Sequence, residues 1–504
     1  MKDRATADSM FEENGVFSDA SGEKIFGKLR VAGSDSQLSM WHGETFDVRV
    51  PAGGVMTGVL NDLTRVTLID CISEGSAAGS AGGEQTYCRA EFFPHFVLKG
   101  TGHLDTASDR IESVTFFVED AHVLFYDFDA FGSVLFDKEL LKEVLKRRRV
   151  KRKVRTGKHP WVMYFTGSHN IISFDSPLGR ITATHCPTAN TGGASGVGME
   201  NRVGINLKPS APVRFEEIPN RVHVLMRLLA VLIGRPQKLE ETLLTVRRGK
   251  GATPMDKLLR MYWSQDSRPP RGSSKPHPRD VLLSPIRAPQ EFKNVCTRWL
   301  EMDAERKDAR GRFLSSFGEG NVYGVNRIVG AANMFDILPA SAAPKTVTLT
   351  TEQQAAKAQA KKLFKALTPS DETQSLMEAL NRLGTATLRR KMLHRADIVV
   401  AQVGPKFPNL DIVLGEAVRC RNHYVHGSPT RIDYSVNLSA LSFLVETLEF
   451  VFAASDLVDA GWDIRAWCSE AHGNGHPFGE YKSNYKAESA QPSTLADKLK
   501  GFKV

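Results

Sequence analysis

The sequence predicts an α+β protein of several domains, in which an antiparallel, sandwich-like β-rich domain precedes an all-α helical bundle. Three observations support this prediction. The chain has 504 residues, which is too long for one compact core. Short β-branched and aromatic segments dominate up to about residue 212, and helical patterns dominate from about residue 219. A Pro- and Ser-rich segment, residues 267–280, indicates a linker or exposed loop.

The predicted strands of the N-terminal part are short and are bounded by Gly, Asp, Ser or Pro. They are residues 27–33, 36–43, 64–73, 87–100, 110–120, 122–128, 161–167, 169–175 and 179–185. So many short strands favour an antiparallel sandwich or a barrel-like domain. The Gly- and Ala-rich residues 73–85 are predicted to be a flexible loop, and residues 134–149 a helix between two sets of strands.

The first long predicted helix begins at Pro219, which suits the first turn of a helix, and runs to Arg235. Further helices are predicted at 289–317, 321–338, 352–366, 371–383, 385–396, 408–426 and 435–457. We therefore divide the chain into a β-rich domain (1–235), a helical connector with the Pro-rich linker (236–288), a helical bundle (289–470) and a disordered polar tail (471–504).

Composition narrows the class of protein. Hydrophobic residues make up 41% and charged residues 24%, as in soluble globular proteins. The polar N-terminus lacks the apolar region of a signal peptide, and the apolar run 222–233 is too short to cross a membrane. Six dispersed cysteines without a CxxC pair argue against a zinc ribbon or a disulfide framework and favour the reducing cytoplasm. Cys468, His472 and His476 have a zinc-like spacing, but glycines interrupt it, so we expect no metal or other cofactor.

The net charge of +9 permits a polyanionic partner, and much of it lies in one run. Residues 146–155 read KRRRVKRKVR, with eight basic residues in ten. Such a run suits binding to RNA phosphates but is also typical of a solvated helix end, and both interpretations stay open. The residues that would contact RNA are Lys146, Arg147, Arg148, Arg149, Lys151, Arg152 and Lys153.

The chemistry-bearing motif is CRNHYVHG, residues 420–427, at the end of a predicted helix. Arg421 falls on an apolar stripe, and a buried guanidinium needs a carboxylate or a bound anion. Asp336 is a candidate carboxylate. Asn422 lies four residues before His426, so the two share a face of the helix. Gly427 ends the helix, and the frayed last turn would let His426 swing toward Arg421. An arginine that holds phosphate beside a histidine that moves protons is the minimum for phosphodiester transesterification.

The bare spacing of Arg and His is weak, because it recurs at Arg89/His95, Arg180/His185, Arg271/His277 and Arg389/His394. Arg419 also meets the spacing to His426, so either arginine could hold the phosphate. Without further context, the motif is a helix end enriched in Arg and His by the helix dipole.

The motif nevertheless resembles the Arg-Asn-x-x-x-His signature of HEPN domains, the small helical nucleases of prokaryotic defence systems. The segment VNRIVGAANMFDILP (325–339) and the helices after it are similar to the HEPN domain of ApeA-like abortive-infection proteins. Residues 10–235 resemble the β-rich N-terminal domain of that family, with the segments GKLRVAG, TRVTLIDC and RIESVTFFVED.

The resemblance implies a metal-independent endoribonuclease whose two motif helices meet in a homodimer. His426 would move protons at the ribose 2′-hydroxyl or the leaving 5′-oxygen, and Arg421 would bind the scissile phosphate. Asn422 would orient His426 or a phosphate oxygen, and His423 would have a supporting role at most. The N-terminal domain would sense a phage-derived trigger or restrain the nuclease, and the substrate would be RNA, with tRNA a candidate.

Two other hypotheses remain. HEPN-like bundles also serve as inactive RNA-binding or dimerisation scaffolds, although the complete Arg-Asn-His set favours the enzyme. A nucleotide-handling enzyme is the weaker alternative, since no Gly-Ser motif with paired aspartates supports it. We expect a cytoplasmic protein with no membrane partner, and an oligomer larger than a dimer is compatible with the sequence.

Overall fold

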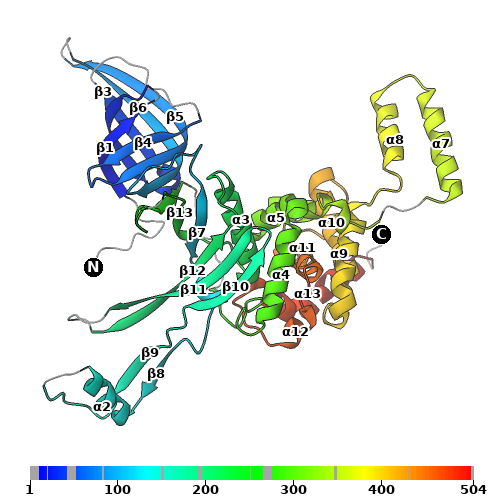
Figure 1. Cartoon of the computed structure of the whole chain (residues 1–504). Coiled ribbons are helices and arrows are strands. Elements are labelled where there is room, and N and C mark those ends of the chain that lie inside the picture. The colour runs from blue at the N-terminus through cyan, green and yellow to red at the C-terminus, as the bar shows by residue number, and fades with distance from the viewer. Residues whose placement is uncertain are drawn as a thin grey trace. The chain divides into compact units, whose positions relative to one another are not determined.

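The structure is a computed structural model of the whole chain. It describes residues 11–19, 21–42, 53–81, 85–148, 152–190, 194, 196–249, 251–264, 275–345, 349–430 and 432–500. The chain divides into two compact units. The β unit comprises Met1–Ile233, Gln237–Pro269 and Leu283–Lys293, and the helical unit comprises Gly234–Pro236, Pro270–Leu282 and Asn294–Val504. The predicted α+β class, with β structure first and helices after it, is confirmed (Figure 1).

The first part of the β unit is an antiparallel barrel. Its strands are β1 (Phe11–Ser18), β2 (Lys24–Val31), β3 (Gln37–His42), β4 (Met56–Leu60), β5 (Arg65–Ala81) and β6 (Gln85–Gly100). They pair in the order β6-β3-β2-β1-β4-β5, and β5 pairs with β6 to close the circle. Phe17 fills the interior where Gly27 and Gly58 flank its ring, because a Cβ at either glycine would lie within 3 Å of ring atoms. Of the two predicted alternatives, this first part of the β unit is thus the barrel-like one.

The sheet continues from β6 beyond the barrel. The order there is β6-β14-β13-β7-β12-β11-β10, and every pairing is antiparallel. The strands are β7 (Ile111–Val118), β10 (Asn170–Ser176), β11 (Gly179–Asn190), β12 (Gly198–Lys208), β13 (Leu239–Val246) and β14 (Leu258–Trp263). Helix α3 (Glu217–Ile233) packs on this sheet, with His223 against Trp263 of β14 at 4.6 Å between ring centroids. The short helix α1 (Ala121–Leu124) and the separate hairpin β8 (Phe131–Leu135) and β9 (Trp161–Phe165), with α2 (Lys138–Arg147), complete the unit.

Several expectations for this unit are wrong in detail. The predicted connector 236–288 contributes β13 and β14 to the sheet, since Thr242, Leu244 and Val246 alternate inward as strand residues do. The loop expected at 73–85 is strand through Ala81, because ladder pairing to β6 needs no particular side chains. Residues 122–128 are not a strand, and the helix predicted over 134–149 begins only at Lys138, after strand β8. Most of the linker 267–280 lies outside the described residues.

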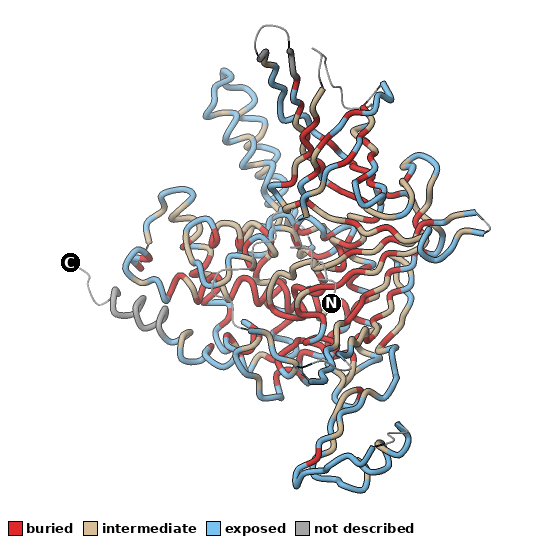
Figure 2. The backbone as a smooth tube through the Cα atoms, turned by 90° about the vertical axis from the view of Figure 1, so that its left-hand side faces the viewer, coloured by how far each residue is buried: buried red, intermediate tan, exposed pale blue. Residues whose placement is uncertain are grey.

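The helical unit is built around α11 (Leu438–Asp459). The other helices are α4 (Pro289–Glu301), shared with the β unit, and α5 (Asp303–Phe317), α6 (Val325–Asp336), α7 (Thr351–Lys365), α8 (Asp371–Arg382), α9 (Leu388–Val403), α10 (Leu410–His426), α12 (Ile464–Ser469) and α13 (Pro477–Lys500). By length and composition α11 could cross a membrane, but 78% of its apolar window is buried in the unit. Figure 2 shows this concentration of buried residues along the helices.

Two carboxylates near the end of α11 pair with buried arginines of neighbouring helices. Asp456 accepts hydrogen bonds from Arg306 at 2.7 Å and from Arg310 at 2.9 Å, both on α5. Farther along, Asp459 accepts from Arg395 of α9 at 2.7 Å. Such charges are stable inside a protein only when paired in this way, so they fix how α5 and α9 lie against α11.

The tail expected to be disordered from residue 471 is wrong as far as residue 500. Phe478, Tyr481 and Tyr485 recur at helical spacing in α13 and are buried. Tyr481 packs on Phe450 of α11 at 4.9 Å between ring centroids. The polar residues between them fall on the exposed side of this amphipathic helix.

Candidate active site

The predicted motif lies on the last turns of α10, as expected. The helix packs its apolar row Val413, Ala417 and Cys420 into the bundle, and these side chains are fully buried. Gly427 ends the helix with φ +65°, in the left-handed region that glycine adopts without strain, and its N–H donates to the carbonyl of His423 at 2.9 Å. Burial raises the pKa of the Cys420 thiol to about 12, so this cysteine is core and not a nucleophile.

Arg421, Asn422 and His426 form one hydrogen-bonded cluster. Nη1 of Arg421 lies 3.0 Å from Nε2 of His426 and donates to Oδ1 of Asn422 at 3.1 Å. Because a guanidinium carries only donors, this contact is a hydrogen bond when Nε2 of His426 is the acceptor. His426 itself is exposed, while Arg421 and Asn422 are half-buried. The arrangement therefore presents a guanidinium and an imidazole side by side at the surface.

Two details differ from the expectation. The backbone stays helical through His426, so the long arginine side chain, and not a frayed turn, spans the five-residue separation. Arg421 also lies at the edge of the buried row and not within it, since Val425 of the same predicted stripe is 42% exposed. Its Nε is buried and has no hydrogen-bond partner among the described residues. Among the described residues, the guanidinium is held through Nη1, by Asn422 and His426.

Arg419, the rival arginine, is occupied elsewhere. It donates to the buried Glu416 at 2.7 Å, and the same carboxylate accepts from Tyr434 at 2.7 Å. Tyr434 is buried, and burial together with this hydrogen bond raises its pKa. The Glu416 contacts hold the segment after α10 against the helix and leave Arg421 as the arginine beside His426.

The remaining predicted residues lie around this cluster or away from it. His423 uses Nδ1 to contact the carbonyl of Ser428 at 2.9 Å, so it anchors the chain just beyond Gly427. Asp336 is not the partner of Arg421. It lies 4.0 Å from Nζ of Lys391 on α9, and its backbone carbonyl accepts from that same lysine.

The basic run begins on the last turn of α2. Lys146, Arg147 and Arg148 are exposed, and Arg147 pairs with Glu143 one turn earlier at 2.6 Å. Arg152 and Lys153 are exposed as well, whereas Arg149 and Lys151 lie outside the described residues. The run belongs to the β unit.

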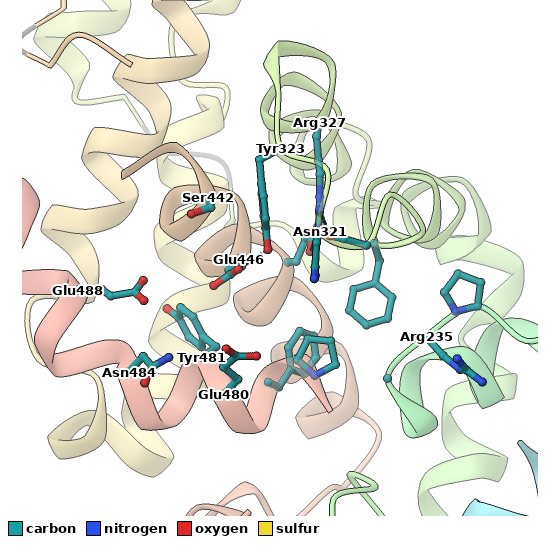
Figure 3. Close-up of a pocket in the computed structure, with 17 residues that line it drawn as sticks. Arg235, Asn321, Tyr323, Arg327, Ser442, Glu446, Glu480, Tyr481, Asn484 and Glu488 are labelled. Carbon is teal, nitrogen blue, oxygen red and sulfur yellow. Dashed lines mark hydrogen bonds and ion pairs between the residues drawn. The ribbon is translucent and has the colours of Figure 1, made fainter. Parts of the chain in front are cut away.

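A second polar site, missed by the sequence reasoning, is a cavity of about 450 Å³ in the helical unit. Figure 3 shows carboxylates of α11 and α13 gathered on one side, among them Glu446, Glu480 and Glu488, opposite Tyr323 and Arg327. Arg327 is bound to Glu449 by two hydrogen bonds of 3.0 and 2.9 Å. The signal in the sequence is a pair of glutamates, one turn apart, in the middle of the mostly apolar segment 438–459.

Glu446 is the unusual group of this cavity. Burial is the largest cause of a pKa raised from 4.5 to about 7, and the nearby carboxylates of Glu488 and Glu449 add to it. The hydroxyl of Tyr323 donates to Glu446, and burial with this carboxylate raises the pKa of Tyr323. The cavity does not include Arg421 or His426.

Comparison with known families assigns both halves of the chain. Residues 12–299 match the model of ApeA N-terminal domain 1, which is more than half of the sequence. The chain belongs to the ApeA family. Residues 329–465 match the Apea-like HEPN domain, which contains the whole of α10. No curated protein and no solved structure matches significantly.

The expected resemblance is thereby confirmed. An ApeA N-terminal domain followed by a HEPN domain is the organisation of an abortive-infection effector family. The HEPN domain points to nuclease activity at the level of the family. The cleavage chemistry, the substrate and the assembly of this ApeA protein are matters of proposal.

Proposed function

We propose that this ApeA protein is an antiphage effector that cleaves RNA without a metal ion, through Arg421, Asn422 and His426. The observation that carries the proposal is the 3.0 Å contact between Arg421 and His426 at an exposed helix end within a HEPN domain. Asn422 fixes the guanidinium from the other side. A scaffold would have no need for an imidazole held beside a guanidinium at its surface.

The resting contact suggests how the site would start its reaction. A scissile phosphate competes with His426 for the guanidinium, because an anion attracts it more strongly than a neutral nitrogen does. When Arg421 turns to the phosphate, Nε2 of His426 becomes free to accept the proton of the ribose 2′-hydroxyl. The 2′-oxygen then attacks phosphorus, the bond to the 5′-oxygen breaks, and a 2′,3′-cyclic phosphate forms. Arg421 stabilises the charge that builds on the phosphate oxygens.

The leaving 5′-oxygen needs a proton, and His426 of a second copy, in its protonated imidazolium form, would supply it. We therefore propose a homodimer in which the ends of two α10 helices meet. Three exposed apolar residues near this end support it, namely Val425, Val436 and Leu438, at 42%, 77% and 60% exposure. Such residues favour burial in an interface. Higher oligomers would be a further means of restraint.

An unrestrained ribonuclease would be toxic, so we propose that the ApeA N-terminal domain holds it inactive until a phage-derived trigger binds. Degradation of cellular RNA, with tRNA a candidate substrate, would then arrest the infected cell. We place this RNA degradation in the cytoplasm, because the six cysteines of the chain are free thiols, as is usual in a reducing compartment.

The test is incubation of purified protein with total RNA, with and without EDTA, beside His426→Ala and His423→Ala. We expect cleavage that survives EDTA and is lost in His426→Ala. His423→Ala is the matched control, since it removes a neighbouring histidine that faces the backbone of Ser428. Cleavage that requires Mg²⁺, or that persists in His426→Ala, would refute the mechanism. Binding of RNA without cleavage under any condition would favour the scaffold hypothesis.

A further inference from the structure

The hairpin β8–β9 with α2 forms an arm of the β unit, residues 131–165. Its strands pair from Phe131 opposite Phe165 at the base to Leu135 opposite Trp161 at the far end. The hairpin is a sheet of its own and stands away from the larger sheet in Figure 1. Helix α2 has no buried residue, so this helix does not contribute to the core of the β unit.

The base of the arm is fixed by aromatic contacts. Phe131 stacks on Phe165 with ring centroids 4.6 Å apart, and His185 of β11 meets Phe131 edge-on at 5.2 Å. His185 is itself buried. The arm is therefore anchored to the main sheet at one end and open at the other.

The open end exposes aromatic side chains. Trp161 is 65% exposed and Phe136 is 62% exposed. Phe136 also adopts φ +65°, a left-handed conformation that a bulky residue rarely takes, and its N–H donates to the carbonyl of Pro160. Leaving large rings in water forgoes the stabilisation that their burial gives, which is the mark of a surface that binds something.

Basic residues lie in the same arm. From Val144 to Pro160 the sequence has no acidic residue. Arg148, Arg152, Lys153, Arg155 and Lys158 are all exposed. Exposed rings beside a run of cations match the requirements of a single-stranded nucleic acid, whose bases stack on aromatic faces while its phosphates meet the charges.

We infer that the arm is a binding element for single-stranded RNA, in which Trp161 and Phe136 stack on bases. The exposed cations Arg152, Lys153, Arg155 and Lys158 contact the phosphates. The inference rests on the proposed function, because it supplies the site that holds the substrate. The exposed cations of the arm would repel a basic partner and would find few anions on a partner with few acidic groups. A duplex would leave the rings without bases to stack on, since its bases are already paired and stacked.

The test measures binding of a short fluorescein-labelled oligouridylate to the full chain by anisotropy. All proteins carry His426→Ala, so that cleavage does not interfere. We expect Trp161→Ala to weaken binding at least about fivefold, and Trp161→Phe to retain most of the affinity, because it keeps a stacking ring. Phe26→Ala, which removes an exposed ring of β2, is the matched control and should bind as the parent does.

A second pair of variants tests the charges. Arg152→Glu with Lys153→Glu should weaken binding and lower the salt slope of log Kd by about 0.7 for each lost phosphate contact. The control reverses two exposed lysines of α7, Lys362→Glu with Lys365→Glu, and should leave the slope unchanged. Unchanged RNA binding in both arm variants would overturn the inference. The inference would also be overturned if the arm variants lost the parent's binding to vesicles of phosphatidylcholine and phosphatidylserine but still bound RNA. The arm would then be a membrane-binding element.

This outcome is separate from that of the proposed function. Arm variants that bind RNA normally, in a protein that cleaves RNA through His426, would refute the arm alone. RNA binding that depends on the arm, in a protein that shows no cleavage, would refute the nuclease alone.

Discussion

The raised pKa of Glu446 predicts that this glutamate weakens the helical unit as pH rises. Its folded-state pKa is about 7, against an ordinary value of 4.5, chiefly because burial disfavours its charge. Below about pH 4.5 the carboxyl is protonated in both the folded and the unfolded chain. As the pH rises from there to about 7, the unfolded chain loses this proton first, so the free energy of unfolding falls. Above that range the loss is complete.

The size of the effect follows from the two pKa values. Each pKa unit corresponds to about 1.4 kcal/mol, so the difference amounts to about 3 kcal/mol. Glu446 is partly accessible to water in its cavity, and screening reduces this to about 2 kcal/mol. Glu446→Gln keeps an oxygen that accepts from Tyr323 but carries no charge. The variant should therefore gain about 2 kcal/mol on the parent between about pH 5 and about pH 8.

The assay is thermal unfolding followed by far-ultraviolet ellipticity, which reports mainly the helices. We expect the melting temperature of Glu446→Gln to rise relative to the parent by about 4–8 °C over this pH interval. Glu480→Gln, which removes an exposed carboxylate of the same cavity, is the control and should keep the parent's pH dependence. A difference between Glu446→Gln and the parent that stays constant with pH would refute the reasoning.

Two further predictions concern the arginines. Arg421→Ala should lower RNA cleavage by about 100-fold or more, while Arg419→Ala should stay within a few-fold of the parent, because Arg419 is paired with Glu416. If Arg421→Ala and Arg419→Ala lowered the initial rate of cleavage equally, Arg421 could not be assigned as the arginine that binds the phosphate. Asp456→Ala should destabilise the helical unit by about 3–5 kcal/mol, since it leaves Arg306 and Arg310 buried without their shared carboxylate. A melting temperature unchanged by this substitution would contradict the role given to the pairs.

The sequence predicted most helices within a few residues, because their apolar positions recur with a clear period. The sequence-based prediction failed for segments whose structure depends on contacts with residues far away in the chain. Strands β13 and β14 fall in the predicted connector, since each is short and, besides pairing with each other, they join strands β7 and β6 that lie more than a hundred residues away. Helix α13 falls in the predicted disordered tail because its polar residues outnumber Phe478, Tyr481 and Tyr485. Only the packing of these rings on α11 shows that the segment is a core helix.

At the site, the sequence located the motif but not the geometry within it. Spacing left Arg419 and Arg421 equivalent, and the difference between them depends on Tyr434, which helps Glu416 to hold the segment after α10. The cavity at Glu446 could not be predicted, because residues of α6, α11 and α13 that are distant in sequence form it.

The most direct test of RNA cleavage through a 2′-hydroxyl is the chemistry of the product ends. We expect RNA fragments whose 5′ ends accept label from polynucleotide kinase without prior phosphatase treatment, and whose 3′ ends are cyclic phosphates. RNA with 2′-O-methyl groups throughout should resist cleavage, because it lacks the nucleophile. Products with 5′-phosphates, or cleavage of the methylated RNA, would contradict the assignment of His426 and Arg421.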